Sequence, residues 1–525
     1  MAGLKKTTVA RDEPLSISEG RQSIHTTRMR EHFFRQQEPQ GTDPPVHPIM
    51  ALFRRKQQHN PCEIATQPSV FDDPERARYF HPTENYEGIH RFDPEARWTW
   101  AEELPLINKL DRKITLWAWI AVMCTNLDSV NISQANTDNF LDDLGLSTDD
   151  FNLGNTAFKV AFICASLPSQ LISKKVGHRI WIPTIMCSWS VVALSQFWLR
   201  GRTSFLICRV LLGLLEGGFP SIILLYLSYF FKGTELPVRL AIFYTSINIV
   251  YIVAPILALG ILRLRGYHGQ AGWRWLFLIE GIITFAGGVW SWFAMASSPT
   301  QTRSWYRPKG WFSEREEVIM VNRILRDDPS KGDMNTRQGV DLKGLWMALC
   351  DFDLWPIYIA SFVYKMVPGV FEQYLTLVLR DLGFDTFNSN LLAIPAQVAG
   401  IFTTLIPTYL SEIWDERSLM SVFAQVWILP NIIALAVLPN GTSPWTKYAI
   451  MSIVISRPYL QGMQIAWGSR NSNAVGTRTV SVAVANMFAE LSGVVYSNIY
   501  RADDRPECTL ATIIFRCFIT DLNNW

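Results

Sequence analysis

From Lys113 onward, apolar residues gather in long runs separated by short polar breaks. Each run has about 20 residues, which is the length that a helix needs to cross a bilayer. Eleven runs occur, at residues 113–133, 153–172, 180–199, 205–229, 239–262, 274–297, 354–376, 388–411, 418–438, 445–468 and 478–499. Six runs precede a long polar interval and five follow it. The pattern therefore predicts an all-α polytopic membrane protein that is built from two helical halves.

The polar stretches divide the chain around these halves. Residues 1–100 are polar, contain scattered prolines and show no periodic apolar face, so we expect a disordered cytoplasmic N-terminal tail. Residues 101–297 would form a first transmembrane bundle of six spans, and residues 354–505 a second bundle with five confident spans. The remaining residues, 506–525, make an atypical C-terminal tail.

A hydrophilic segment, residues 298–353, joins the two halves and is expected to be a cytoplasmic loop. It contains one predicted helix, because Ser313 and Glu316 stand at the spacing of a capping box and the residues from Glu316 to Leu325 are amphipathic.

Orientation follows from the charges of the short loops. Basic residues concentrate after the second and fourth runs and in the central loop, which carries nine Lys or Arg, and such loops face the cytoplasm. The loop after the first run holds five Asp residues and no Lys or Arg, which is typical of the outside. Arg263, Arg265 and Arg274 after the fifth run fit this scheme less well. The pattern predicts a cytoplasmic N-terminus.

Composition agrees with a membrane protein. The chain has 525 residues, of which 49% are apolar and 18% charged, and its 20 Trp and 30 Phe exceed what a soluble protein of this size usually carries. A net charge of +2 argues against a nucleic-acid partner. None of the eight His lies deep in a run, and no nucleophile with a base or metal-ligand spacing is visible. We therefore predict no enzymatic activity, no cofactor and no metal.

Ionisable residues inside the runs are the most informative positions, because a charge in hydrocarbon is costly and usually marks a substrate or proton pathway. They include two acids, Asp128 and Glu216, and three bases, Lys159, Arg209 and Lys365. Arg209 and Glu216 are seven residues apart, so on one helix they share a face.

Several motifs carry a family resemblance. Three stretches resemble the anion:cation symporter family of the major facilitator superfamily. They are LDSVNI at residues 127–132, Arg209 with the following Gly213, Glu216, Gly217, Gly218 and Pro220, and GWRWLFLIEG at residues 272–281. Four further motifs are similar to the fungal allantoate permease subgroup of this family: PSQLISKK at 168–175, YLSYF at 226–230, ELPVR at 235–239 and PKGWF at 308–312. The resemblance covers roughly Trp98 to Pro506.

This resemblance implies a major facilitator fold of two six-helix halves that rock around a midplane site. It also implies proton-coupled symport of a small organic anion into the cell. Carriers of this kind take allantoate, ureidosuccinate, small peptides, vitamin acids or sulfonates. The protein is then a multi-pass, monomeric carrier of the plasma membrane, whose partners are the anion, protons and the lipid bilayer.

The resemblance assigns proton coupling to the acids at Asp128 and Glu216, with Arg209 as their charge partner. A static network that ties spans 1 and 4 together is the alternative. Where the family has an Arg directly after the first acid, this chain has Ser129, so the usual cation of the substrate site is missing.

Other residues are then expected to bind the substrate. Lys159 matches a basic position of the subgroup and is the first choice. Asn131 and Arg209 join the predicted substrate-binding set, and so does Lys365, which could instead snorkel or pair with Glu372.

The loop between spans 2 and 3 resembles a worn version of a loop that the superfamily conserves, without its usual Asp. Its residues Lys174, Lys175, Gly177 and Arg179 are assigned to gating and topology. The glycines around Glu216 are expected to allow close helix packing.

The twelfth span is short or missing, because residues 508–520 offer only about a dozen residues interrupted by Arg516. Two further alternatives stay open at this point. The chain could be a nutrient sensor on a carrier scaffold, or an inactive truncated carrier.

Overall fold

The structure is a computed structural model of the chain. It describes residues 60–496 except residues 85, 234, 334–345, 347–348, 351, 367–368, 370–385, 415–417, 440–441, 460 and 462–474. The predicted C-terminal tail, residues 506–525, and the question of a twelfth span lie outside the described residues.

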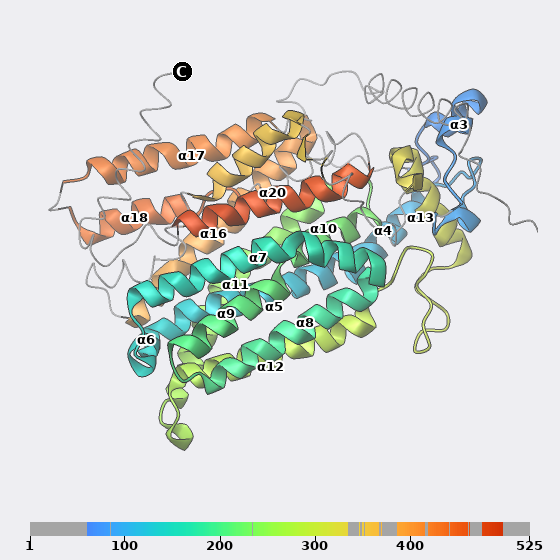
Figure 1. Cartoon of the computed structure of the whole chain (residues 1–525). Helices are drawn as coiled ribbons and strands as arrows, with labels where there is room; N and C mark the ends of the chain where they lie inside the picture. Colours follow the sequence, from blue (N-terminus) through green and yellow to red (C-terminus); the bar gives the residue numbers. More distant parts are fainter. Residues whose placement is uncertain are drawn as a thin grey trace, which may run out of the picture.

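The first half is a bundle of long helices that run side by side (Figure 1). They are α5 (Leu116–Ala135), α7 (Thr148–Val176), α8 (His178–Ser195), α9 (Arg202–Glu216), α10 (Phe219–Ser228), α11 (Leu236–Ile261) and α12 (Gly272–Ala294), with the short α6 (Phe140–Leu144) after α5. Each of the six apolar runs predicted for this half is helical. Five helical stretches of the described chain are long and apolar enough to cross a membrane, all of them in this half.

The fourth run bends between α9 and α10. Gly218 has a φ of 85°, which only glycine adopts without strain, and a Cβ there would lie 2.8 Å from the carbonyl oxygen of Ser166. Gly213 likewise lies against α7, because its Cβ would meet the carbonyl oxygen of Phe158 at 2.3 Å. The glycines therefore serve the close packing of α9 and α10 on α7, as their spacing predicts.

In the described part of the second half, residues 355–366 are helical, followed by α16 (Thr386–Trp414), α17 (Ser418–Val437), α18 (Pro444–Ile455) and α20 (Val475–Tyr496). Within the predicted span 445–468, helix α18 ends at Ile455 and residues 457–459 are not helical, whereas residues 460 and 462–468 lie outside the described residues. Pro458 explains this end, since it lacks an amide proton and restricts the residue before it. The chain there bonds to α16 instead, with the backbone N–H of Tyr459 donating to the hydroxyl of Thr404 at 2.9 Å.

The halves meet along two helix pairs. α7 packs against α20, and α11 packs against α16. Figure 1 shows these helices from distant parts of the sequence lying next to one another. These contacts join the first half to the second.

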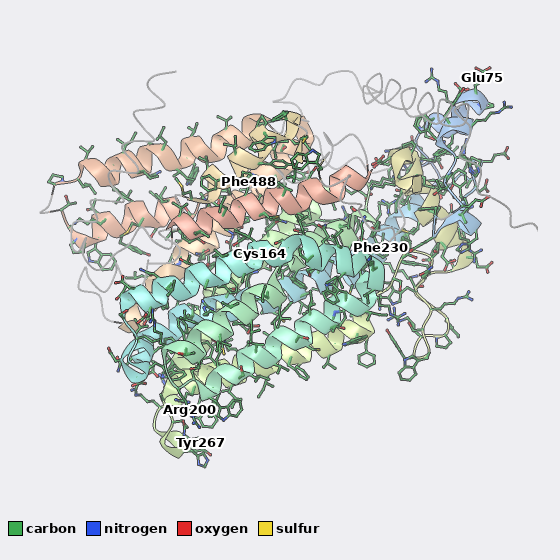
Figure 2. The ribbon with its side chains drawn as sticks, viewed as in Figure 1. Glu75, Cys164, Arg200, Phe230, Tyr267 and Phe488 are labelled. Carbon is green, nitrogen blue, oxygen red and sulfur yellow. The ribbon has the colours of Figure 1, made fainter. Side chains whose placement is uncertain are left out.

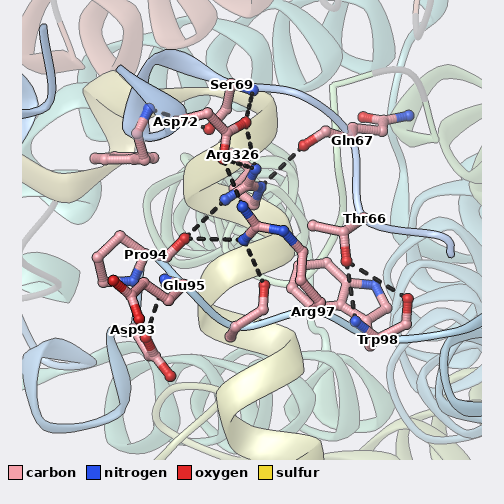
Figure 3. Close-up of polar contacts among 12 residues, drawn as sticks. Thr66, Gln67, Ser69, Asp72, Asp93, Pro94, Glu95, Arg97, Trp98 and Arg326 are labelled. Atoms are coloured by element: carbon pink, nitrogen blue, oxygen red, sulfur yellow. Dashed lines mark hydrogen bonds and ion pairs between the residues drawn. The ribbon is translucent and has the colours of Figure 1, made fainter. Parts of the chain in front are cut away.

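Residues 60–100 differ from the expectation of a disordered tail. They form η1 (Val70–Asp72), α3 (Pro74–Phe80), η2 (Ile89–Arg91) and the start of α4 (Trp100–Leu110), and they pack against α13 (Glu314–Asp327). In Figure 3 the Arg326 guanidinium of α13 holds this segment, with both carboxylate oxygens of Asp72 at 2.6 Å and the carbonyl of Gln67 at 2.9 Å. The apolar residues of the segment are spread over short turns and form no periodic apolar face, so the sequence pattern does not predict this ordered structure.

Helix α13 itself begins as predicted. The hydroxyl of Ser313 accepts the backbone N–H of Glu316 at 3.3 Å, and the carboxylate of Glu316 accepts that of Ser313 at 2.7 Å. This capping box satisfies amides that would otherwise lack a partner at the helix start. Glu75 on α3 marks the end of the molecule that carries this segment, and Arg200 and Tyr267 lie at the opposite end (Figure 2).

Candidate functional site

A cavity of ≈ 210 Å³ lies between the two halves. Helices α5, α7, α9, α10 and α11 of the first half line it, together with residues 365, 369, 459 and 461 and α20 of the second half. Its described ionisable residues are three cations and two carboxylates, apart from tyrosines: Lys159, Arg209, Lys365, Glu216 and Glu490.

Two lysines converge on one glutamate in this cavity. The Nζ of Lys159, on α7, lies 2.6 Å from Oε2 of Glu490, and the Nζ of Lys365 lies 2.5 Å from Oε1 of the same carboxylate. Glu490 belongs to α20, so the first contact joins the two halves. The three side chains keep 21%, 15% and 15% of their surface exposed, because they face the cavity.

The structure thus brings Lys159 and Lys365 together, as a shared role at the substrate site requires. The described partner of Lys365 is Glu490, and the alternative partner Glu372 lies outside the described residues. The sequence analysis did not assign Glu490, although an acid inside the run 478–499 is a signal of the same kind as Glu216. Its partners lie 331 and 125 residues away, which no local pattern reveals.

The stem of Lys159 runs along α20. A Cβ on Gly493, one turn after Glu490, would lie 3.1 to 3.4 Å from the last carbons of that stem. The ammonium of Lys159 also sits 5.5 Å from the centre of the Phe158 ring, at cation–π distance. The lysine is therefore directed towards the cavity by its packing.

Arg209 and Glu216 both line the cavity from α9, as their seven-residue spacing predicts. The Nη2 of Arg209 donates to the side-chain oxygen of Asn155 at 2.8 Å, and its guanidinium lies 5.2 Å from the Phe158 ring centre. Glu216 accepts a long hydrogen bond of 3.4 Å from the hydroxyl of Ser129. Ser129, which stands where the sequence analysis expects an arginine, therefore contacts the predicted coupling acid.

Asp128 and Asn131 are three residues apart on α5 and do not belong to the cavity lining. Both are buried. The polar neighbours of Asp128 include Trp189 on α8 and Thr284 on α12, and its charge interacts with those of Glu216 on α9 and Glu280 on α12. The structure thus places Asp128 behind α5, away from the two lysines.

Glu280 is a second acid that the sequence analysis did not single out. Its side chain is fully buried, and within the described ranges neither Glu280 nor Asp128 has an ion-pair partner. The signal was present, since Glu280 stands in the middle of the apolar run 274–297.

The residues assigned to gating lie at the junction of α7 and α8. Gly177 links the two helices with a φ of 97°, Lys174 is buried and Lys175 is exposed. The guanidinium of Arg179 donates to the hydroxyl of Ser304 at 2.6 Å, which ties this junction to the segment after α12. Within the described part of the chain, no group of His, Cys, Asp and Glu could hold a metal ion.

Comparison with known proteins gives the following matches. The family model described as Major Facilitator Superfamily matches residues 118–497. An uncharacterized transporter of Saccharomyces cerevisiae is 42% identical over 465 residues, which cover 88% of this chain and 85% of that protein. An uncharacterized transporter of Schizosaccharomyces pombe is 25% identical over 423 residues, which cover 80% of this chain and 82% of that protein.

A solved structure is similar in fold. The proton:xylose symporter XylE bound to 6-bromo-6-deoxy-D-glucose aligns with a TM-score of 0.61 at 15% identity, over 77% of this chain and 92% of that chain. At this identity the likeness concerns the arrangement of the helices.

Proposed function

Because this chain belongs to the major facilitator superfamily, we propose that it is a secondary carrier that takes a small organic anion into the cell together with protons. The observation that carries the proposal is the convergence of Lys159 and Lys365 on one carboxylate in the cavity between the halves. A carboxylate already occupies the place between the two cations, which supports an anionic head group as the natural ligand of that place.

The charges of the cavity favour the same ligand. Its described lining carries three cationic side chains and two carboxylates, apart from tyrosines, so one positive charge remains in excess when all five are ionised. An excess of positive charge away from bulk water attracts an anion and disfavours a cation as the ligand. Allantoate, ureidosuccinate, vitamin acids and sulfonates all present such a head on a small polar body.

Proton coupling is assigned to Asp128 and Glu216. Glu216 lines the cavity and interacts electrostatically with Lys159, Arg209 and Glu490, so its charge affects the site where the anion would bind. Asp128 lies on the other side of α5, one residue before the serine that contacts Glu216. A proton on Glu216 would therefore change the charge on the cavity side of α5, and a proton on Asp128 would change the charge on its other side. The proposed carrier is monomeric and resides in the plasma membrane with its N-terminus in the cytoplasm.

A competition panel tests the proposal. Purified protein in detergent is heated with allantoate, ureidosuccinate, pantothenate or nicotinate at several pH values, and nicotinamide serves as the neutral counterpart of nicotinate. At least one anion is expected to raise the melting temperature, most at low pH, whereas nicotinamide has no effect. Equal protection by nicotinamide and nicotinate, with no effect of the other anions, would argue against an anion site.

A further inference from the structure

We propose that Glu490 is a resident counter-ion that the substrate anion displaces. The anionic head takes its place between Lys159 and Lys365, while Glu490 takes up a symported proton. The inference rests on the proposed function and adds a third coupling acid, located in the second half.

The geometry makes the two anions alternatives. Both oxygens of Glu490 are engaged, one by each ammonium, at 2.6 and 2.5 Å. Charge-assisted contacts of this length are the strong class of hydrogen bond. Each ammonium group has further N–H donors, but the position between the two nitrogens, where one carboxylate contacts both, can hold only one carboxylate at a time. Because the three side chains border the cavity and remain partly exposed, a ligand can reach them without unfolding a helix.

The proton balance is simple. Released from the lysines, an ionised Glu490 would be an unpaired charge in a bundle core, which is costly. A proton that binds one of its oxygens removes that charge. Both lysines stay protonated, the ion pairs to Glu490 are replaced by ion pairs to the ligand, and entry of one anion with one proton leaves the net charge of the cavity unchanged.

The displaced contact also joins the halves. Lys159 lies on α7 of the first half, whereas Glu490 and Lys365 lie in the second. The Lys159–Glu490 ion pair holds α7 and α20 together across the cavity. A bound anion would hold both lysines in its place, so the connection between the halves then depends on the ligand.

Other ionisable groups face this part of the cavity and set the background for any pH effect. Arg209 and Glu216 face it from α9, and Tyr244, Tyr459 and Tyr496 face it from α11, the segment after α18 and α20. Among these described groups, Glu216 is the other carboxyl, so the test must separate Glu490 from Glu216.

The test compares wild-type protein with Glu490→Gln and Glu490→Asp in detergent, using allantoate, ureidosuccinate, pantothenate and nicotinate as probes. Equilibrium dissociation constants are measured between about pH 5 and about pH 8, the range in which a perturbed carboxyl group titrates. Glu490→Gln removes the carboxylate that competes with the probe, so binding no longer requires a proton. At the upper pH the best probe is therefore expected to bind about tenfold more tightly to this variant than to the wild type, because one pKa unit corresponds to a factor of ten. Its affinity is also expected to depend far less on pH than that of the wild type. Glu490→Asp keeps a carboxyl group and should retain the pH dependence. Glu216→Gln still contains Glu490, so it should retain the part of the pH dependence that Glu490 contributes.

Protein stability is followed in the same samples. If Glu490→Gln unfolds, the double variant Glu490→Gln/Lys365→Gln removes one cation with the anion and keeps the net charge of the cavity. Because it also lacks one of the two ligand-binding cations, its expected result is the loss of the pH dependence that Lys365→Gln alone retains. A folded variant that binds the probe with unchanged or weaker affinity and an unchanged pH dependence would overturn the inference. In that case the wild type still binds the anion, so the proposed function stands. A wild type that binds none of the probes contradicts the proposed function itself.

Discussion

Two glutamates in this molecule are each held by two cations, and their surroundings differ. Glu103 on α4 has Lys232 at 2.7 Å and Arg323 at 3.2 Å from the same carboxylate oxygen, and its other oxygen accepts the indole N–H of Trp98 at 2.8 Å. Glu490 has the two lysines of the cavity. The Glu103 cluster is sealed, with Arg323 0% and Glu103 1% exposed, whereas all three side chains of the Glu490 cluster keep part of their surface free.

The comparison shows that a buried glutamate between two cations is not a functional site by its chemistry alone. Around Glu103 the three partners leave the carboxylate no free oxygen and no contact with solvent, and Arg323 also pairs with Glu235. That cluster fastens α4 and α13 to the loop before α11. Around Glu490 an open volume adjoins the charges, so a ligand can replace one of them. The accessible space distinguishes the structural cluster from the proposed transport site.

The largest effect is expected from Glu103→Gln. Removing one partner of a buried ion pair typically costs about 3–5 kcal/mol, because the remaining charges stay buried without compensation. A strong drop in the melting temperature of the purified protein at neutral pH checks this. A variant as stable as the wild type would show that the sealed cluster contributes nothing to stability.

The same cluster predicts a dependence of stability on pH. Burial raises the pKa of the Glu103 carboxyl, but the charges of Lys232 and Arg323 and the hydrogen bonds of Lys232 and Trp98 outweigh it, so the pKa is lowered overall. A lowered native pKa means that this contribution is present above the unfolded-state pKa and is lost as the pH falls through the native value. The stabilities of wild type and Glu103→Gln are therefore expected to converge in strong acid.

A smaller effect is expected from Lys159→Gln in the open cluster. A hydrogen bond to a charged group contributes about 1.5–3 kcal/mol, so the substrate constant should rise at least about tenfold. The amount of protein at the membrane should remain near that of the wild type, which immunodetection at the cell surface measures. Lys113→Gln, at an exposed position outside the cavity lining, is the matched control and should leave the constant unchanged. An unaltered constant in Lys159→Gln would shift the anion site to Lys365 or Arg209.

The smallest effect is expected from Glu102→Gln, the residue beside Glu103. Its partner Arg315 is half exposed, with 51% of its side chain accessible, and the pair is separated by 3.0 Å. Exposed ion pairs contribute about 0–1 kcal/mol and weaken with added salt. The melting temperature should therefore change little, and a loss as large as that of Glu103→Gln would remove the distinction between sealed and exposed pairs.

The sequence predicts what is local in this structure. Runs of apolar residues give the long helices of the first half, and Ser313 with Glu316 gives the start of α13, because helix length and capping depend on neighbouring residues. Lys159 lines the cavity, and its role in substrate binding stays a prediction. Pro458 shows the limit of the local pattern, since the apolar run continues past the point where α18 ends.

Other features depend on contacts that no local pattern contains. Glu490 meets Lys159 across 331 residues, and Arg326 fixes Asp72 across 254 residues. Asp128 and Ser129 are neighbours, yet only Ser129 faces the cavity, because the two sides of α5 pack against different helices. Periodicity shows that α5 is a buried helix but does not show which side faces the cavity.

The most direct test of coupled anion transport is uptake into proteoliposomes with an imposed inward proton gradient. Radiolabelled allantoate, ureidosuccinate, pantothenate and nicotinate are offered to wild-type protein and to Glu216→Gln, and both net accumulation and exchange against preloaded unlabelled anion are measured. Wild-type protein is expected to accumulate at least one anion above its external concentration. Glu216→Gln should fail to accumulate it while still exchanging it in part. Accumulation by Glu216→Gln equal to that of the wild type would contradict the coupling role of this carboxyl group.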